Sequence, residues 1–119
     1  MPGDDVDVAD SDDLYRRILP YHIKPDGAVS SAAFKDRRGR PLQRFSVDLA
    51  RLTTPEECVG RAGPGFRLIT FRAGAARALG FRVWHEPEGG SHAHCHVEGE
   101  NSNETCYDLA ASSWPVEVP

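Results

Sequence analysis

Three histidines stand at alternate positions near the C-terminal end of the chain, and they are the residues whose types and spacing best suit chemistry. His92, His94 and His96 fall within residues 91–99, Ser-His-Ala-His-Cys-His-Val-Glu-Gly, with Cys95 between the last two histidines. Imidazole nitrogens and thiolates are donors that Zn²⁺ prefers, and His-x-His on a strand places two imidazoles on one face. The run therefore indicates a metal site. Its alternative is a row of histidines on the polar face of a sheet.

The geometry of a strand limits how many of these histidines one ion can hold. Side chains on one face follow each other at ~7 Å, so His92 and His96 are ~13 Å apart and two of the three can share an ion. If residues 81–85 and 92–97 form a hairpin with a six-residue loop, His85 lies opposite His92 on the same face. The same register sends four residues to the other face: Trp84, Ala93, Cys95 and Val97. The further ligands available by type are His85, His22, Glu86, Asp108 and Cys106.

A small enzyme is the second interpretation of the polar residues. Five side chains from different predicted strands could line one cleft: Arg16, Ser31, Ser46, Asp48 and His94. The arginine would hold an anionic group and the histidine would move a proton, because an imidazole of pKa ~6.5 accepts and donates near neutral pH. The reaction would be a metal-assisted hydrolysis. No nucleophile elbow surrounds the serines, so their alternative is a set of surface hydroxyls on an antiparallel sheet.

Short strands must position these residues. Alternation of apolar and polar side chains predicts strands over residues 42–49, 66–71 and 81–85. Residues 28–35 show a similar alternation and are also predicted as a strand, whereas residues 14–19 fit either a strand or a helical turn.

Helix signals occur between these strands. Thr54 is a predicted N-cap, followed by Pro55 and Glu57, in a helix that Gly63 ends. Further helices are predicted over residues 72–80 and over residues 101–114. The last one begins at Asn101 or Ser102 and has an inner side formed by Cys106, Leu109 and Ala110. Short helices between strands indicate a small single α+β domain, with a mixed or antiparallel sheet and two or three short helices.

Composition indicates one intracellular domain. The chain has 119 residues, 39% hydrophobic and 27% charged, which is enough for one modest core. Six aspartates within residues 1–13 predict a disordered acidic tail, which leaves residues 14–119 as the domain. With no membrane-length apolar run, no secretory signal and three unclustered cysteines, the chain is predicted to be cytoplasmic with reduced thiols. Its arginines are scattered over turns, without the aromatic platform typical of nucleic-acid binding.

Four stretches, in this order, resemble a small family of uncharacterised bacterial proteins: LYRRILP, VSSAAFK, FSVDLARLTTPEE and HAHCHVEG. The similarity covers about residues 14–99. The family pattern has an arginine-rich first element, a Ser-Ser-x-x-Phe strand, a Ser-Val-Asp strand and a single histidine that matches His94. The resemblance implies no established activity, and it makes His92 and His96 additions of this sequence. An arginine on the first strand and serines on later ones are also faintly similar to ADP-ribosyltransferases, without the catalytic glutamate motif on a late strand. This similarity implies ADP-ribosyl transfer as a second reaction for the enzyme interpretation, after metal-assisted hydrolysis.

These observations favour a small binding or accessory protein that acts on a protein partner and has no chemistry of its own. The absence of a catalytic motif and the modest core support this interpretation. The metal hypothesis adds a Zn²⁺ site to it, with four histidines as the predicted ligands: His92, His94, His96 and His85.

Overall fold

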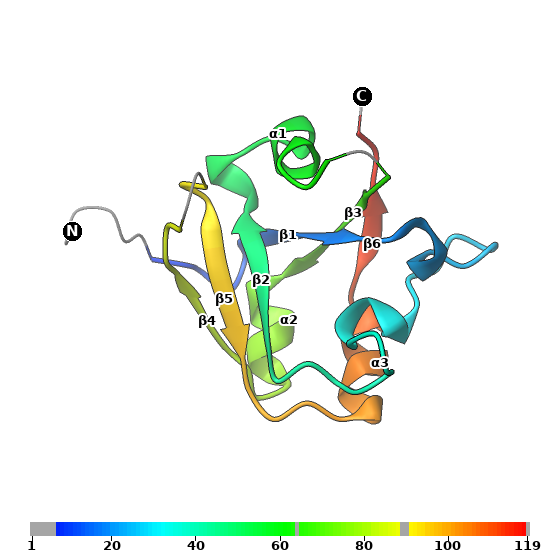
Figure 1. The fold of residues 1–119 in the computed structure, drawn as a ribbon. Coiled ribbons are helices and arrows are strands. Elements are labelled where there is room, and N and C mark those ends of the chain that lie inside the picture. The colour runs from blue at the N-terminus through cyan, green and yellow to red at the C-terminus, as the bar shows by residue number, and fades with distance from the viewer. Residues whose placement is uncertain (1–6, 64, 89–90, 119) are drawn as a thin grey trace.

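The computed structural model describes residues 7–63, 65–88 and 91–118. Within these residues the chain forms a six-stranded sheet with antiparallel pairing throughout, in the order β4-β5-β2-β1-β3-β6 (Figure 1). The strands are β1 (Asp13–Ile18), β2 (Arg44–Leu49), β3 (Arg67–Arg72), β4 (Arg82–His85), β5 (His94–Glu98) and β6 (Trp114–Val116). The predicted α+β class is confirmed, and of the two sheet types the antiparallel one is present.

Short helices link the strands. The described residues contain α1 (Pro55–Gly60), α2 (Ala73–Ala78), α3 (Asn103–Ala111) and the 3₁₀ turns η2 (Pro20–His22), η3 (Ser31–Phe34) and η4 (Ala50–Leu52). Thr54 caps α1 by accepting a hydrogen bond from the Glu57 amide at 3.2 Å, and Ser102 caps α3 through the Thr105 amide at 3.1 Å. Both helix starts are therefore confirmed. Each cap satisfies an amide that has no partner within its own helix.

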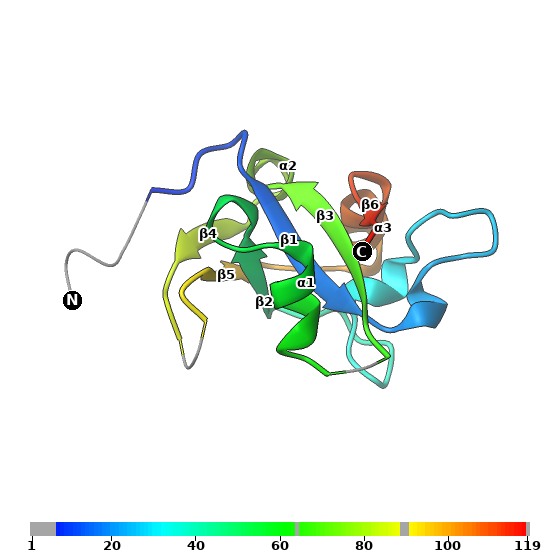
Figure 2. The same cartoon turned by 90° about the horizontal axis from the view of Figure 1, so that it is seen from above.

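The two faces of the sheet are covered differently. The core face carries most of the buried apolar side chains, and α2, α3 and η3 contribute to the same cluster. Its largest members include Phe34, Phe45, Phe71 and Phe81. Figures 1 and 2 show α1 on the other side of β1 from α2 and α3. On the opposite face α1 packs near β1 and β3, and the β4–β5 end carries polar side chains, among them the buried His94 and His96.

Residues 31–34 form a 3₁₀ turn, so the strand predicted over residues 28–35 is wrong. Ser30 accepts a hydrogen bond from the Ala32 amide at 3.1 Å, which begins the turn. A short hydroxyl side chain that bonds the backbone two residues ahead competes with strand pairing. Phe34 then enters the core from the end of the turn. Alternation among small residues resembled a strand pattern because Ser and Ala carry little periodic information.

Strand β6 was not predicted from the sequence. It has three residues, and Pro115 lies in its centre opposite Ile69 of β3. Proline cannot donate to a strand ladder, so it occurs in sheets mainly on edge strands. Because β6 is the last strand of the sheet, Pro115 is tolerated there and helps to keep that edge from pairing with other chains.

Residues 7–13 are packed on the domain, in contrast to the disordered tail predicted for residues 1–13; residues 1–6 lie outside the described part. Asp13 belongs to β1, and the backbone carbonyls of Asp10 and Asp12 accept hydrogen bonds from the Gly74 and Ala73 amides, both at 2.9 Å. The two acidic side chains also form ion pairs with basic partners, Asp10 with Arg77 at 2.8 Å and Asp12 with Arg51 at 3.0 Å. Charge density alone misled the prediction because the partners lie far away in sequence.

Phe34 should be one of the most sensitive positions of the core. Its ring is fully buried, with ring centres of Phe45 and Phe71 at 5.6 and 5.7 Å. We expect Phe34→Ala to lower the free energy of unfolding by ~3–5 kcal/mol, because it removes buried apolar surface and leaves a cavity. Denaturant unfolding measures this. Tyr21→Ala, at a residue that is 72% exposed, is the control and should change stability by less than ~0.5 kcal/mol. Equal losses in the two variants would contradict the assignment.

Candidate metal centre

The register of β5 places His94 and His96 on the polar face of the sheet. On β2, Asp48 pairs with His94 and Ser46 pairs with His96, while Trp84 of β4 pairs with His96 from the other side. Directly paired residues of antiparallel strands point to the same side. These five residues define what we call the polar face. Both imidazoles are nearly covered, with 7% of His94 and 6% of His96 exposed.

His85 lies on the core face, so the hairpin register predicted from a six-residue loop is wrong. In the structure His85 pairs with Cys95, not with His92, because residues 86–93 connect the two strands. The shift is an odd number of residues, which moves every side chain of β4 to the opposite face relative to β5. Trp84 consequently joins the histidines instead of the core. Cys95 faces away from His94 and His96 as predicted, and shares the core face with His85.

His92 precedes β5 and does not share the polar face as a strand residue. It lies in the turn before the strand, where its carbonyl is 2.8 Å from Nε2 of His85 and the two rings are 5.8 Å apart. The four histidines of the predicted site thus form two separate pairs. The structure brings together His94 with His96, and His85 with His92.

Glu88 completes a group of three possible ligands with His94 and His96. One donor atom from each residue lies within 4.8 Å of the other two. Oε2 of Glu88 is 3.2 Å from Nε2 of His96 and 3.9 Å from Nδ1 of His94, and the imidazole rings are 4.5 Å apart. Donors that bind one tetrahedral ion at ~2.1 Å lie ~3.4 Å from each other. Oε2 of Glu88 and Nε2 of His96 already have about this spacing. Nδ1 of His94 lies farther off and is also 3.0 Å from the backbone carbonyl of Glu86, so this ring must leave that carbonyl or turn its Nε2 toward Glu88 to share the ion.

Glu86 is the only one of the additional ligands proposed by type that reaches this group in the described residues. Its Oε2 is 3.3 Å from Nε2 of His96. A hydrogen bond from the Trp84 indole at 3.0 Å, opposed by slight burial and helped by the nearby His96, holds the pKa of Glu86 below its ordinary value. The other predicted candidates lie on different elements: His22 in η2, and Cys106 and Asp108 in α3. Glu88 itself was missed because nothing in the sequence shows how its loop folds back.

The hydrogen bonds of the two imidazoles differ. Nδ1 of His94 is 3.0 Å from the backbone carbonyl of Glu86, so this nitrogen carries the proton in the neutral ring and Nε2 keeps its lone pair. A carbonyl partner of this kind is usual behind a metal-binding histidine. His96 is approached instead by a donor, the Nε–H of Arg44, at 3.4 Å from its Nδ1. The neutral ring of His96 therefore directs its Nε2–H at the carboxylates of Glu86 and Glu88.

Asp48 is a buried carboxylate beside this group, with 1% of its surface exposed. Oδ2 accepts hydrogen bonds from Arg17 and Arg61, and the Ser91 hydroxyl donates to Oδ1 at 3.4 Å. Ser91 exchanges backbone hydrogen bonds with Glu88 at 2.9 and 3.1 Å. Asp48 thus connects two arginines to the loop that carries the glutamate ligand.

The charge of Asp48 is stabilised by its partners. Burial acts to raise the pKa of this carboxyl, but hydrogen bonds from Cys58 and Arg61 and the charges of Arg17 and Arg61 outweigh burial, and the pKa lies below its ordinary value. The same burial and contact with Asp48 raise the pKa of the Cys58 thiol to about 12, so the thiol stays protonated. The cluster is ionic and structural, without a reactive thiolate.

The cleft predicted from Arg16, Ser31, Ser46, Asp48 and His94 does not form. Arg16 shares the core face with Leu14 and Ile18, where it donates to the carbonyls of Ala33 at 2.9 Å and Ser46 at 3.2 Å. Ser31 belongs to η3, on the same side of the sheet. The other three side chains are on the polar face, where the arginine is Arg17. Adjacent strand residues point to opposite sides, so Arg16 and Arg17 lie on different faces of the sheet. The prediction placed Arg16 in the polar cleft, and Arg17 is the arginine that lies there.

Arg16 instead supports the core. Its guanidinium lies 4.7 Å from the Phe45 ring centre and 5.8 Å from that of Phe34. Burial, and secondarily the charge of Arg17, lowers its pKa to about 10, which still leaves it cationic at neutral pH. With its donors on backbone carbonyls, Arg16 stabilises the junction of β1, β2 and η3.

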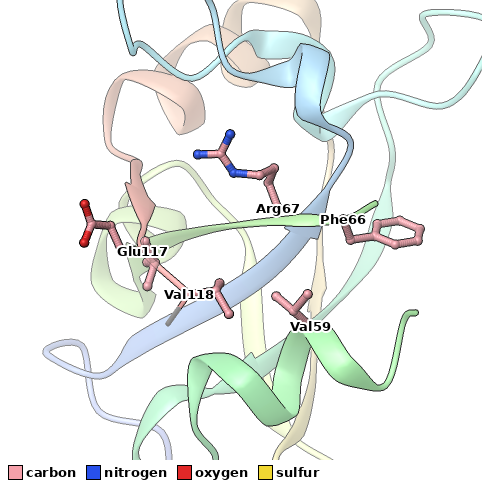
Figure 3. A pocket seen from close by; sticks show the side chains of 6 residues that line it. Val59, Phe66, Arg67, Glu117 and Val118 are labelled. Carbon is pink, nitrogen blue, oxygen red and sulfur yellow. The ribbon is translucent and has the colours of Figure 1, made fainter. Parts of the chain in front are cut away.

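A cavity of about 580 Å³ lies away from the histidines, between α1, the start of β3 and the C-terminal segment (Figure 3). Its lining consists of Val59, Phe66, Arg67, Val116, Glu117 and Val118. In the close view Val59 and Val118 approach each other, whereas Phe66 and Glu117 point outward. Valines with one cation and one carboxylate that do not converge provide no catalytic arrangement. The polar face therefore remains the best candidate site.

Comparison with known proteins identifies no relative: no family model, no curated protein and no solved structure matches the chain. The resemblance to a bacterial family thus stays a prediction. Among the described residues, no helix has the length and apolar character needed to cross a membrane.

Replacing Asp48 should change how stability depends on pH. Because its folded pKa is lowered, Asp48 contributes stability above its unfolded value of ~4, and this contribution is lost as the pH falls through the lower folded value. We expect Asp48→Asn to cost ~2 kcal/mol near neutral pH, since it removes the negative charge that pairs with Arg17 and Arg61, and to flatten the stability profile below pH ~4. Denaturant unfolding at several pH values measures both effects.

The matched control is Asp108→Asn, the same change at an exposed helix residue. It should leave both stability at neutral pH and the acid profile unchanged. An Asp48→Asn protein with the stability and acid dependence of this control would show that the buried carboxylate carries no net stabilisation.

Proposed function

We propose that this protein is a small metal-binding domain that holds one divalent transition-metal ion, preferably Zn²⁺, through His94, His96 and Glu88. The observation that carries the proposal is the convergence of two nearly buried imidazoles and one carboxylate within 4.8 Å. Two of these ligands come from one strand, and the third comes from the loop before it. The site is thus local in sequence and rests on a sheet that fixes the direction of both histidines.

The donor types favour zinc over calcium or magnesium. Imidazole nitrogen suits Zn²⁺, Ni²⁺ and Cu²⁺, whereas Ca²⁺ and Mg²⁺ prefer six or more oxygen donors. Two histidines and one glutamate leave one position of a tetrahedral ion for a further ligand. Glu86, at 3.3 Å from His96, is the nearest carboxylate for that position. With Glu86 bound, the shell consists of protein ligands alone.

A binding role is favoured over metal-assisted hydrolysis by the surroundings of the group. A hydrolytic zinc ion needs an open position for water and a cavity for substrate beside it. The 580 Å³ cavity lies at the other end of the sheet, near β3 and β6, and Glu86 competes with water for the fourth position. We therefore infer that the bound metal stabilises the β4–β5 end of the sheet and does not take part in hydrolysis.

The binding test uses untagged full-length protein, freed of metal with a chelator and titrated with Zn²⁺. We expect one ion per chain in calorimetry, and Co²⁺ substitution should give the absorption of a tetrahedral site. His94→Ala, His96→Ala and Glu88→Gln should each remove a ligand. For the histidine variants we expect a loss of more than ~100-fold in affinity, beyond the 10–100-fold typical of outer-shell changes.

His92→Gln is the matched control, because it removes a histidine two residues from His94 whose side chain lies outside the group. Its affinity should equal that of the natural protein. Absence of stoichiometric binding, or an equal loss in His92→Gln and His96→Ala, would refute the proposed site and leave an unspecific histidine-rich surface.

Acidification should weaken metal binding. Protons compete with the ion for the lone pairs of both imidazoles, so apparent affinity must fall as the ligands become protonated. We expect the affinity for Zn²⁺ to fall more steeply with decreasing pH in the natural protein than in His94→Ala, because this variant lacks one of the two imidazole ligands and retains the other. Titrations at matched ionic strength measure this, and an affinity independent of pH would exclude histidine ligands.

A further inference from the structure

Arg44 makes a contact that conflicts with metal binding at His96. Its Nε–H points to Nδ1 of His96 at 3.4 Å, and that bond requires a lone pair on Nδ1. A neutral imidazole has one lone pair, so Nε2, the nitrogen that faces Glu88 at 3.2 Å, then carries the proton. A metal ion in the proposed group needs the lone pair on Nε2. The ring cannot serve Arg44 and the ion at the same time.

The position of Arg44 is set by groups other than His96. Its strand pairs with β5 so that Arg44 lies opposite Glu98, and its guanidinium is 5.5 Å from the Trp84 ring centre. Arg82 of β4 is 4.8 Å from the same ring and 3.7 Å from the Glu98 carboxylate. Arg44 and Arg82 therefore bring equal charge to one tryptophan, but among the described residues only Arg44 donates a hydrogen bond to His96.

We propose that Arg44 regulates the metal site by competing with the ion for His96. In the metal-free protein Arg44 holds His96 in the tautomer that directs Nε2–H at Glu88. Binding of the ion moves the ring proton to Nδ1, replaces the Nε2–H···Glu88 contact with metal bonds and ends the hydrogen bond from Arg44. This inference rests on the proposed function and adds a second state to it.

The two histidines differ in their tautomers. His94 already has the tautomer in which Nε2 keeps its lone pair, because its Nδ1 faces the carbonyl of Glu86. His96 must change its tautomer first. Entry of the ion therefore has a free-energy cost at His96, and a variant without the Arg44 donor lowers that cost.

The experiment compares Arg44→Met with Arg82→Met, which remove the same charge from the same tryptophan and retain an unbranched side chain. We expect Arg44→Met to bind Zn²⁺ about tenfold more tightly than Arg82→Met, because only the first change releases His96 from a hydrogen bond to a charged donor. Thermal unfolding of both variants without metal checks that each is folded. Equal affinities, or weaker binding by Arg44→Met, would overturn the proposal.

A second readout does not depend on metal affinity. Long-range ¹H–¹⁵N spectra of the imidazoles report which nitrogen is protonated, and metal-free protein should show His96 with Nε2–H and His94 with Nδ1–H. Arg44→Met should weaken the preference of His96, which then depends on the carboxylates of Glu86 and Glu88, and should leave the tautomer of His94 unchanged. If the spectra show Nδ1–H at His96 in the natural protein, the competition is refuted even where zinc binds.

The outcomes separate this inference from the proposed function. If the natural protein binds zinc and both methionine variants have identical affinities, the role of Arg44 is refuted and the proposed metal site stands. Zinc binding by the natural protein that becomes tighter in Arg44→Met and not in Arg82→Met supports the competition. Absence of binding in the natural protein and in both variants removes the proposed site and, with it, the regulation.

Discussion

The register of β5 between β2 and β4 is the constraint on which the polar face depends. In this register His94 pairs with Asp48, and His96 pairs with Ser46 and Trp84. The pairing decides, for each residue of β5, which face of the sheet its side chain occupies. The same pairing buries Cys95 and Val97 in the core. A shift by one residue would move Cys95 and Val97 to the polar face and place His94 and His96 among the apolar side chains of the core. Hydrophobic packing on one face thus determines the chemistry available on the other.

Charge on the polar face is organised in two connected parts. Asp48 with Arg17 and Arg61 forms the inner part, close to β1 and α1. The histidines and the loop carboxylates form the outer part, toward the β4 edge, and Ser91 joins the two by its hydrogen bond to Asp48. A buried charge that loses its partners is costly, so the inner part limits movement of the loop. The loop in turn limits where a carboxylate can meet the imidazoles.

Signals within short stretches of the sequence predicted most of the helices and strands. The site depends instead on contacts between residues that lie far apart in the sequence. The caps formed by Thr54 and Ser102 act within one helical turn, so the starts of α1 and α3 could be predicted from the sequence. The register between two strands depends on the length and path of the loop that joins them. No residue type within 86–93 indicates the register that this loop produces. That is why His85 was expected beside the other histidines and Glu88 was not. Arg16 and Arg17 show the same limit, since composition cannot tell which of two neighbours faces the core.

The N-terminal segment that caps α2 through its backbone has a consequence for which sequences this fold accepts. Carbonyls of Asp10 and Asp12 make the contacts, so the cap itself places no demand on the side chains that follow the same path. Gly74 is different: a methyl group there would lie 2.9 Å from the Cβ of Asp10 and 3.0 Å from its carbonyl oxygen. Substitution should thus be tolerated along the acidic segment more readily than at the glycine beneath it. Among sequences that adopt this fold, we expect the residues at positions 10 and 12 to vary and the glycine at position 74 to stay the same.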